Sequence, residues 1–184
     1  MHPEILSWCE AIKQLHPEHF KNKRVLEIGS YIVNGSVRDL FHDCDYLGID
    51  VAKGPGVDLV CIAHDLHEPD ASFDVVVSTQ ALEHDMYYHL TLINAVQLLK
   101  PKGLMLLTCA TGTTWEHGVQ GHGAEDSLTT QMSGQWSYYY KNVSPDELQK
   151  ALQDPDEVFE EWNMKVQTNS ASGQDLLFYG IKRE

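Results

Sequence analysis

Residues 25–41 read VLEIGSYIVNGSVRDLF, an apolar run that ends in a glycine and is followed by polar turn residues. A short run of this kind predicts a strand buried on both faces of a parallel sheet. Gly29 predicts a turn directly after the strand, and we expect a short helix from about Gly35 to Phe41. A strand, a turn and a helix in this order open the nucleotide-binding half of many doubly wound α/β folds. The stretch nevertheless lacks the full G-x-G-x-x-G pattern that holds a dinucleotide.

The rest of the chain alternates between the apolar periods of strands and of helices. We expect an N-terminal helix over residues 1–20, with Pro3 near its start. A second helix is predicted over residues 85–100, with Asp85 as its N-cap and Pro101-Lys102-Gly103 as its end. A third is predicted over residues 144–152, where Ser144 and Glu147 match a capping box. Further strands are expected at residues 46–51, 57–62, 73–78, 103–110, 159–167 and 176–182.

These elements predict one fold class. Strands that alternate with helices indicate a parallel sheet, and the connection between the last two strands is too short for a crossover helix, so those two strands should be antiparallel. We therefore expect a Rossmann-like, doubly wound, mostly parallel seven-stranded sheet with an antiparallel C-terminal hairpin and helices on both faces. A chain of 184 residues fits a single domain, residues 1–184.

Composition narrows the classes of partner. The chain has 13 Lys and Arg against 27 Asp and Glu, a net charge of -14, which repels nucleic acids and anionic lipid surfaces. Its four cysteines stand singly, as in a reduced protein. No stretch reaches membrane-spanning length and no apolar leader follows a basic start, so we expect a cytoplasmic protein with neither nucleic-acid nor membrane partners.

The ends of the predicted strands contain the candidate ligand-binding residues, because open α/β sheets bind ligands there. Asp50 ends the second predicted strand, 21 positions after Gly29. An acidic residue at that distance binds a ribose diol in nucleotide-binding folds. Taken alone, Asp50 is equally consistent with capping a loop.

Four segments in register resemble the class I S-adenosylmethionine-dependent methyltransferases, and especially the small methyltransferase-domain proteins. They are VLEIGS, YLGIDV, AHDLHEPDASFDVVVSTQALEH and LLKPKGLMLLT, between Val25 and Thr108. The resemblance implies S-adenosyl-L-methionine as cofactor and S-adenosyl-L-homocysteine as product. Three positions depart from the family pattern: Tyr31 and Val33 replace common glycines, and Ile62 replaces an Asp that binds adenine in many relatives.

Carried over residue by residue, the resemblance also implies a set of site residues. Glu27 and Gly29 would flank the methionine part of the cofactor, and Asp50 would bind the ribose. Ser30, Tyr31 and Val51 beside them would also bind the cofactor. Ala63, His64 and Asp65 would line the adenine, and Ser78, Thr79 and Gln80 would close over the sulfonium. Glu83 and His84 occupy the LEH positions near the substrate entrance, and His84 is the first candidate for a general base.

No Asn-Pro-Pro-Tyr or Asp-Pro-Pro-Tyr motif follows the fourth strand, and the net charge is acidic. The acceptor is therefore expected to be a small molecule with an oxygen or nitrogen nucleophile, with a protein side chain as the other candidate. Two alternatives remain open. One is a non-catalytic module of the same fold that binds a partner or regulates one, and the other is a nicotinamide-dependent oxidoreductase, which the incomplete glycine motif disfavours.

Residues 111–142 are predicted to form a long irregular loop on the substrate side, since such loops in compact domains are often functional. Trp115, Trp136 and the run Tyr138-Tyr139-Tyr140 would form a substrate wall, or pack the loop onto the domain or onto the second copy of a homodimer. The loop also contains four metal-ligating side chains, but their spacing matches no established pattern, so we expect no metal. These are His117, His122, Glu125 and Asp126.

Overall fold

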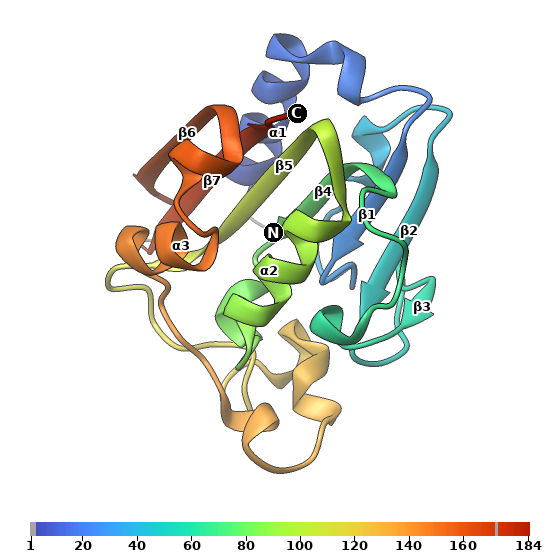
Figure 1. The fold of residues 1–184 in the computed structure, drawn as a ribbon. Coiled ribbons are helices and arrows are strands. Elements are labelled where there is room, and N and C mark those ends of the chain that lie inside the picture. Colours follow the sequence, from blue (N-terminus) through green and yellow to red (C-terminus); the bar gives the residue numbers. More distant parts are fainter. Residues whose placement is uncertain (1–2, 172) are drawn as a thin grey trace.

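A seven-stranded sheet forms the centre of the protein in the computed structural model, which describes residues 3–171 and 173–184 (Figure 1). The strand order is β3-β2-β1-β4-β5-β7-β6. The first five strands pair in parallel, whereas β7 is antiparallel to both β5 and β6. The strands are β1 (Arg24–Ile28), β2 (Asp45–Asp50), β3 (Leu59–Val60), β4 (Phe73–Thr79), β5 (Leu99–Thr111), β6 (Phe159–Thr168) and β7 (Gln174–Lys182).

The order of the strands reverses at β1, which lies between β2 and β4. Glu27 of β1 is opposite Gly48 on one side and Val77 on the other. At such a reversal the connections leave toward opposite faces, which opens a crevice beyond the carboxyl ends of the strands. The fold therefore places a ligand site beyond the ends of β1 and β4.

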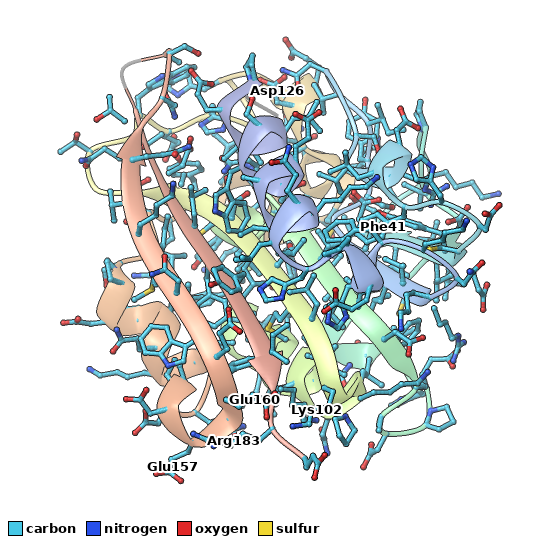
Figure 2. All side chains as sticks on the ribbon, turned by 90° about the horizontal axis from the view of Figure 1, so that it is seen from above. Phe41, Lys102, Asp126, Glu157, Glu160 and Arg183 are labelled. Carbon is cyan, nitrogen blue, oxygen red and sulfur yellow. The ribbon has the colours of Figure 1, made fainter. Side chains whose placement is uncertain are left out.

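Helices cover both faces of the sheet, as the sequence predicts. On one face α1 (Pro3–Leu15) buries Ile5 and Ile12 against strand residues that include Val75. Figure 2 shows α1 lying across the strands on this face, with Asp126 toward one end of the sheet and Lys102 and Glu160 toward the other. The opposite face is covered by α2 (Tyr88–Leu98), α3 (Pro145–Ala151) and α4 (Pro155–Val158).

Three predicted helices differ from the observed ones. The helix expected over Gly35–Phe41 is a single 3-10 turn, η2 (Arg38–Leu40). Val37 and Phe41 are buried in the α1 face of the core without a continuous helix.

The first helix was expected to fill residues 1–20 but ends at Leu15, and a short 3-10 turn, η1 (Pro17–His19), follows it. Pro17 disfavours the helical conformation at His16. Residues 1–2, also within the predicted helix, lie outside the described residues.

The assignment of Asp85 as the N-cap of the second helix is wrong, since α2 begins at Tyr88. The Asp85 carboxylate instead accepts hydrogen bonds from the Tyr87 amide at 2.8 Å and the Thr91 hydroxyl at 2.5 Å. It therefore stabilises the turn that precedes the helix.

Other local predictions are confirmed with adjusted bounds. The capping box is present: Ser144 Oγ accepts from the Glu147 amide at 3.3 Å, and Glu147 Oε2 accepts from the Ser144 amide at 3.0 Å.

The third strand is shorter than predicted because only Leu59 and Val60 pair with β2. The terminal hairpin has β6 at the edge of the sheet. None of the described helices is both long enough and apolar enough to cross a membrane.

Candidate active site

A cavity of about 250 Å³ lies beyond the carboxyl ends of β1, β2 and β4. Its walls come from the turn after β1, the end of β2, the segment after β4 and parts of residues 112–142. The last of these segments, yellow to orange in Figure 1, lies beyond the tips of β1 and β2. Of the residues predicted to form the site, those that line the cavity are Glu27, Gly29, Ser30, Tyr31, Asp50, Val51, Ala63, Thr79, Gln80 and His84.

The turn after β1 is fixed to β2 by its backbone. The amides of Gly29 and Ser30 both donate to the carbonyl oxygen of Ile49, at 3.0 and 3.1 Å. Gly29 has a φ of +76°, a left-handed conformation that favours glycine. These bonds direct the chain from β1 across the end of β2 and along the cavity wall.

Asp50 is held by two backbone amides at the cavity wall. Its Oδ2 accepts from the Tyr31 amide at 3.2 Å and its Oδ1 accepts from the Val51 amide at 2.7 Å. Each carboxylate oxygen has two lone pairs, so both can still accept a hydroxyl proton. Burial raises the pKa of Asp50, and the two amides oppose that rise because they stabilise the charged form.

Glu27 is a buried carboxylate at the end of β1, with 4% of its surface exposed. Burial raises its pKa to about 7, against the opposing effects of Tyr46 and of the Arg38 guanidinium. Arg38 itself lies 4.4 Å from the centre of the Tyr46 ring and forms an ion pair with Asp58. A cationic group entering the cavity beside Glu27 would stabilise its charged form.

The predicted adenine-binding turn, η3 (Ala63–Asp65), contributes only Ala63 to the cavity, together with the neighbouring Ile62. Asn94 of α2 fixes this turn, because its Nδ2 donates to the carbonyl oxygens of Ala63 at 2.9 Å and Leu66 at 3.2 Å. His64 packs against the Tyr87 ring and Asp65 is exposed, so both lie outside the lining.

The end of β4 contains a buried hydroxyl, and the residue that follows the strand has a strained backbone. Gln80 lines the cavity with a φ of +54°, and its amide donates to the Thr108 carbonyl at 2.8 Å. Such backbone strain in a residue other than glycine is common at functional sites. Ser78 lies outside the lining, fully buried, and its hydroxyl has no hydrogen-bond partner among residues 3–171 and 173–184.

His84 lies in the 3-10 turn η4 (Leu82–His84), and its ring is perpendicular to that of His117 at 5.6 Å between centroids. Burial, and to a lesser extent His117, lower the pKa of His84 to about 3. The imidazole is therefore neutral at pH 7. It can accept a hydrogen bond or ligate a cation, but a proton that it accepts is held weakly.

Glu83, next to His84, is fully buried, and burial raises its pKa to about 7. The structure brings Glu83 and His84 together with His117, and not with His122, Glu125 or Asp126. His122 is instead beside Glu116, with 3.6 Å between His122 Nδ1 and Glu116 Oε1.

Residues 112–142 form three 3-10 turns, η5 (Ala124–Asp126), η6 (Leu128–Gln131) and η7 (Gly134–Tyr138). Trp136 and Leu128 line the cavity, and Trp115 lines it while remaining 62% exposed. The segment is attached to β7 because the Thr114 hydroxyl donates to the Gln174 carbonyl at 2.8 Å.

Sequence reasoning missed several lining residues. Asp85 directly follows His84, and this adjacency was the available signal for it. Asn169 and Gly173, in the connection between β6 and β7, also line the cavity. Nothing in the local sequence of that connection distinguishes it from an ordinary turn.

Comparisons with known proteins agree with this geometry. The sequence profile of a methyltransferase domain matches residues 3–166. A search of curated protein sequences found no significant match.

Many solved structures share the fold. The Burkholderia thailandensis 1,6-didemethyltoxoflavin-N1-methyltransferase, solved with 1,6-didemethyltoxoflavin and S-adenosylhomocysteine, has a TM-score of 0.67 and 18% identity over 98% of this chain and 79% of that one. The Haemonchus contortus phosphoethanolamine N-methyltransferase 2, solved with phosphomonomethylethanolamine and S-adenosylhomocysteine, has a TM-score of 0.65 and 14% identity over 97% of this chain. The present chain spans 53% of that enzyme. The YcgJ protein of Bacillus subtilis has a TM-score of 0.63 and 16% identity, with both chains covered completely.

Identities this low establish a shared fold and leave substrate and activity open. The profile match, in contrast, extends over most of the sequence. The chain therefore belongs to the methyltransferase-domain family, and it has the class I S-adenosylmethionine-dependent methyltransferase fold.

Proposed function

We propose that this protein binds S-adenosyl-L-methionine in the cavity and transfers its methyl group to an oxygen or nitrogen atom of a small molecule. The observation that carries the proposal is the position of Asp50. Its two oxygens are fixed by the amides of Tyr31 and Val51 at the end of β2, where a ribose diol is bound in nucleotide-binding folds of this topology.

The other lining residues suit the remaining parts of the cofactor. Glu27 offers a carboxylate for the α-ammonium of the methionine part, and Ile62 and Ala63 offer an apolar surface for the adenine. With Ile62 in place of an acidic residue, adenine would be held by packing and by backbone groups. His64, Asp65 and Ser78, which do not line the cavity, receive no direct contact in this assignment.

The bound cofactor would supply a methyl group already activated by the sulfonium. The protein then has mainly to orient the acceptor in line with that group and exclude water, which are effects of proximity and alignment. Thr79, Gln80 and His84 line the cavity after β4, and Trp136 lines it from the segment after β5. They would position the acceptor.

A small acceptor is supported by the net charge of -14, which repels nucleic acids. Two relatives were solved with small molecules bound, namely 1,6-didemethyltoxoflavin and phosphomonomethylethanolamine. Aromatic side chains at the cavity, Trp115 and Trp136, would favour an acceptor with a flat or apolar part.

Isothermal titration with S-adenosylmethionine and S-adenosylhomocysteine tests the proposal. We expect saturable binding of both, and at least tenfold weaker binding in Asp50→Ala, because a charge-assisted hydrogen bond contributes about 1.5 to 3 kcal/mol. Asp65→Ala is the matched control, since Asp65 is exposed and outside the cavity lining, and should bind like the wild type. Absence of binding of either molecule at millimolar concentration contradicts the proposal.

A non-catalytic role is the second candidate function. Tyr31 and Val33 replace glycines of the family turn, and the pKa of His84, about 3, makes His84 a weak base. The chain would then be a non-catalytic module that regulates a partner. Cofactor binding without methyl transfer to a broad acceptor panel supports this alternative. Transfer that Asp50→Ala abolishes excludes it.

A further inference from the structure

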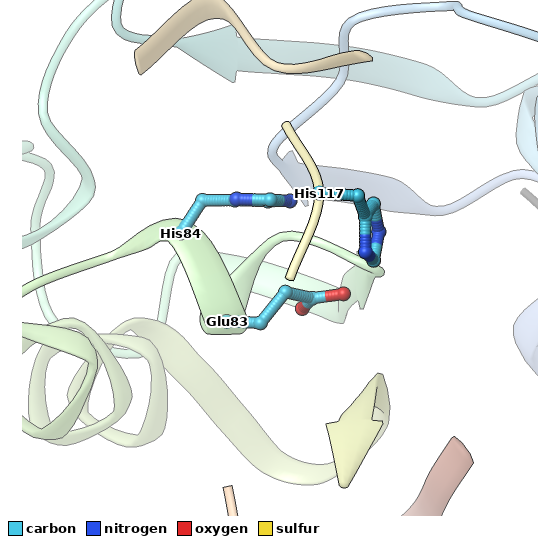
Figure 3. A group of neighbouring side chains, drawn as sticks. All are labelled: Glu83, His84 and His117. Atoms are coloured by element: carbon cyan, nitrogen blue, oxygen red, sulfur yellow. The ribbon is translucent and has the colours of Figure 1, made fainter. Parts of the chain in front are cut away.

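Three side chains with metal-ligating atoms converge at one end of the cavity. Glu83 and His84 come from η4, after β4, and His117 comes from the segment after β5. One ligand atom of each lies within 4.8 Å of those of the other two. Figure 3 shows the two imidazole rings and the carboxylate directed toward a common point.

The cluster contains buried polar atoms without protein partners. Glu83 is 0% exposed, and neither of its carboxylate oxygens forms a hydrogen bond of good geometry within the described part of the chain, although the backbone amides of Glu83 and Ala110 lie near enough to stabilise its charged form in part. Burying a carboxylate without a partner is unfavourable. A bound cation would balance the charge of Glu83.

His117 is already oriented as a ligand. Its Nδ1 lies 3.1 Å from the carbonyl oxygen of Trp115. A carbonyl oxygen only accepts hydrogen bonds, so Nδ1 carries the proton and Nε2 presents its lone pair. Histidines that bind metals usually donate their second ring N–H to a carbonyl or carboxylate in this way, which fixes both the tautomer and the direction of the ring.

We propose that Glu83, His84 and His117 form a binding site for a divalent transition-metal ion of the Zn²⁺ class. Two imidazoles and one carboxylate are a ligand set found in catalytic zinc sites, in which a further coordination position stays open. His84 and His117 line the cavity, so the open position faces it.

The observed spacing requires at most a small movement on binding. Tetrahedral ligands about 2.1 Å from zinc lie about 3.4 Å apart, which is closer than the 4.8 Å limit within which these atoms lie. His117 can supply most of this movement because it is in the irregular segment between β5 and α3. Glu83 and His84 are held in the core.

The consequence for catalysis rests on the proposed function. An acceptor with an oxygen or nitrogen donor would occupy the open position, and the metal would lower the pKa of that donor. Metal binding itself can be measured without any methyl transfer.

The test is a titration of tag-free, chelator-treated full-length protein with Co²⁺, followed by its visible absorption, and with Zn²⁺ in competition. We expect one equivalent to bind, with a rise in melting temperature, since a ligand that binds only the folded state stabilises it. Glu83→Gln and His117→Gln should each weaken binding at least tenfold. His122→Gln is the matched control from the same segment, since its side chain is 67% exposed and outside the cluster, and should leave binding unchanged.

Glu83→Gln preserves the shape of the side chain, so it remains informative if His117→Gln does not fold. Each variant is also titrated with S-adenosylhomocysteine, which reports on the cofactor half of the cavity separately. No saturable binding of Co²⁺ or Zn²⁺ at millimolar concentration overturns the metal site. Binding that both cluster variants retain shows an adventitious ion and also overturns it.

Discussion

Gly29 and Ala81 approach so closely that a Cβ atom added to Gly29 would lie 2.2 Å from the Cβ of Ala81. The contact joins the turn after β1 to the segment after β4, and both residues line the cavity. Because the two segments leave the sheet at the point where strand order reverses, this contact sets the width of the crevice between them.

Gly29→Ala should therefore impair both stability and cofactor binding. The new methyl group would push the two walls apart, and overpacking of this kind costs about 1 to 3 kcal/mol. Gly134→Ala is a close control, because Gly134 has nearly the same φ, +72° against +76°, and nothing within 4 Å of the added Cβ. Urea denaturation and titration with S-adenosylhomocysteine measure the two effects. Equal behaviour of the two variants would show that the contact with Ala81 is unimportant.

Cofactor affinity should depend on pH through Glu27. Burial raises the pKa of Glu27 to about 7, so the empty site holds a proton there that must leave when a cofactor ammonium binds. Affinity for S-adenosylhomocysteine should rise between pH 5.5 and 7.5, by up to about tenfold per pH unit below 7. Titration calorimetry in buffers of different ionisation enthalpy measures the proton released.

Glu27→Gln is the control for this pH dependence. This variant should bind S-adenosylhomocysteine more weakly than the wild type at pH 7.5. The pH dependence of its affinity should lack the part that comes from Glu27. It should keep the part that comes from Asp50, because burial also raises the pKa of Asp50. In the cofactor-free protein, the effect of Glu27 on folding stability has the opposite pH dependence to its effect on cofactor affinity. The folded state holds the Glu27 proton more tightly than the unfolded state, so the contribution of Glu27 to stability falls as pH rises from about 4.5 to about 7.

The fold was predictable because its strands carry strong local signals. The valines of β4 and the glycine that ends β1 fix a strand and a turn from only a few residues each. The segment after β1 differs from the prediction of a helix over residues 35–41, although Val37 and Phe41 are four positions apart. Both are buried in the core from a loop and a single 3-10 turn, which shows that a buried pair at this spacing does not require a helix.

The site was predictable where topology determines it. Glu27, Asp50 and Gln80 stand at or just after the ends of parallel strands, and all parallel strands end at one edge of the sheet. The neighbourhood of Glu83 and His117 was not predictable. The two residues are 34 positions apart, and the path of an irregular segment, which no short sequence period encodes, brings them together.

The capping box of α3 should contribute measurably to stability. Ser144→Ala removes the oxygen that accepts from the Glu147 amide, and loss of an N-cap costs about 1 kcal/mol.

Lys141 and Ser144 lower the pKa of Glu147 to about 2. The contribution of the Glu147 charge to folding stability is therefore complete above about pH 4.5 and is lost as pH falls toward 2. The stability difference between the wild type and Glu147→Gln should shrink accordingly in urea denaturation between pH 6 and 3. A constant difference would mean that the charge of Glu147 is not involved.

Gly118→Ala should detach the segment 112–142 from the site. An added Cβ would lie 2.5 Å from His84 Cε1 and 3.1 Å from Ser127 Cβ, and Gly118 has a left-handed φ of +63°. Because the His84 ring is buried, the segment has to move outward. We expect faster proteolysis within the segment and a melting temperature lower by several degrees. A loss of about 1 kcal/mol lowers the melting temperature of a protein of this size by about 2 to 4 °C.

Gly121→Ala is the control for that variant, because Gly121 lies in the same segment with a more demanding φ of +96° and nothing within 4 Å of the added Cβ. If backbone strain alone mattered, Gly121→Ala would be the more damaging change. If the packing of the segment on His84 matters, Gly118→Ala will be the more damaging change. The order of the two proteolysis rates therefore decides whether residues 112–142 depend on contact with the buried histidine.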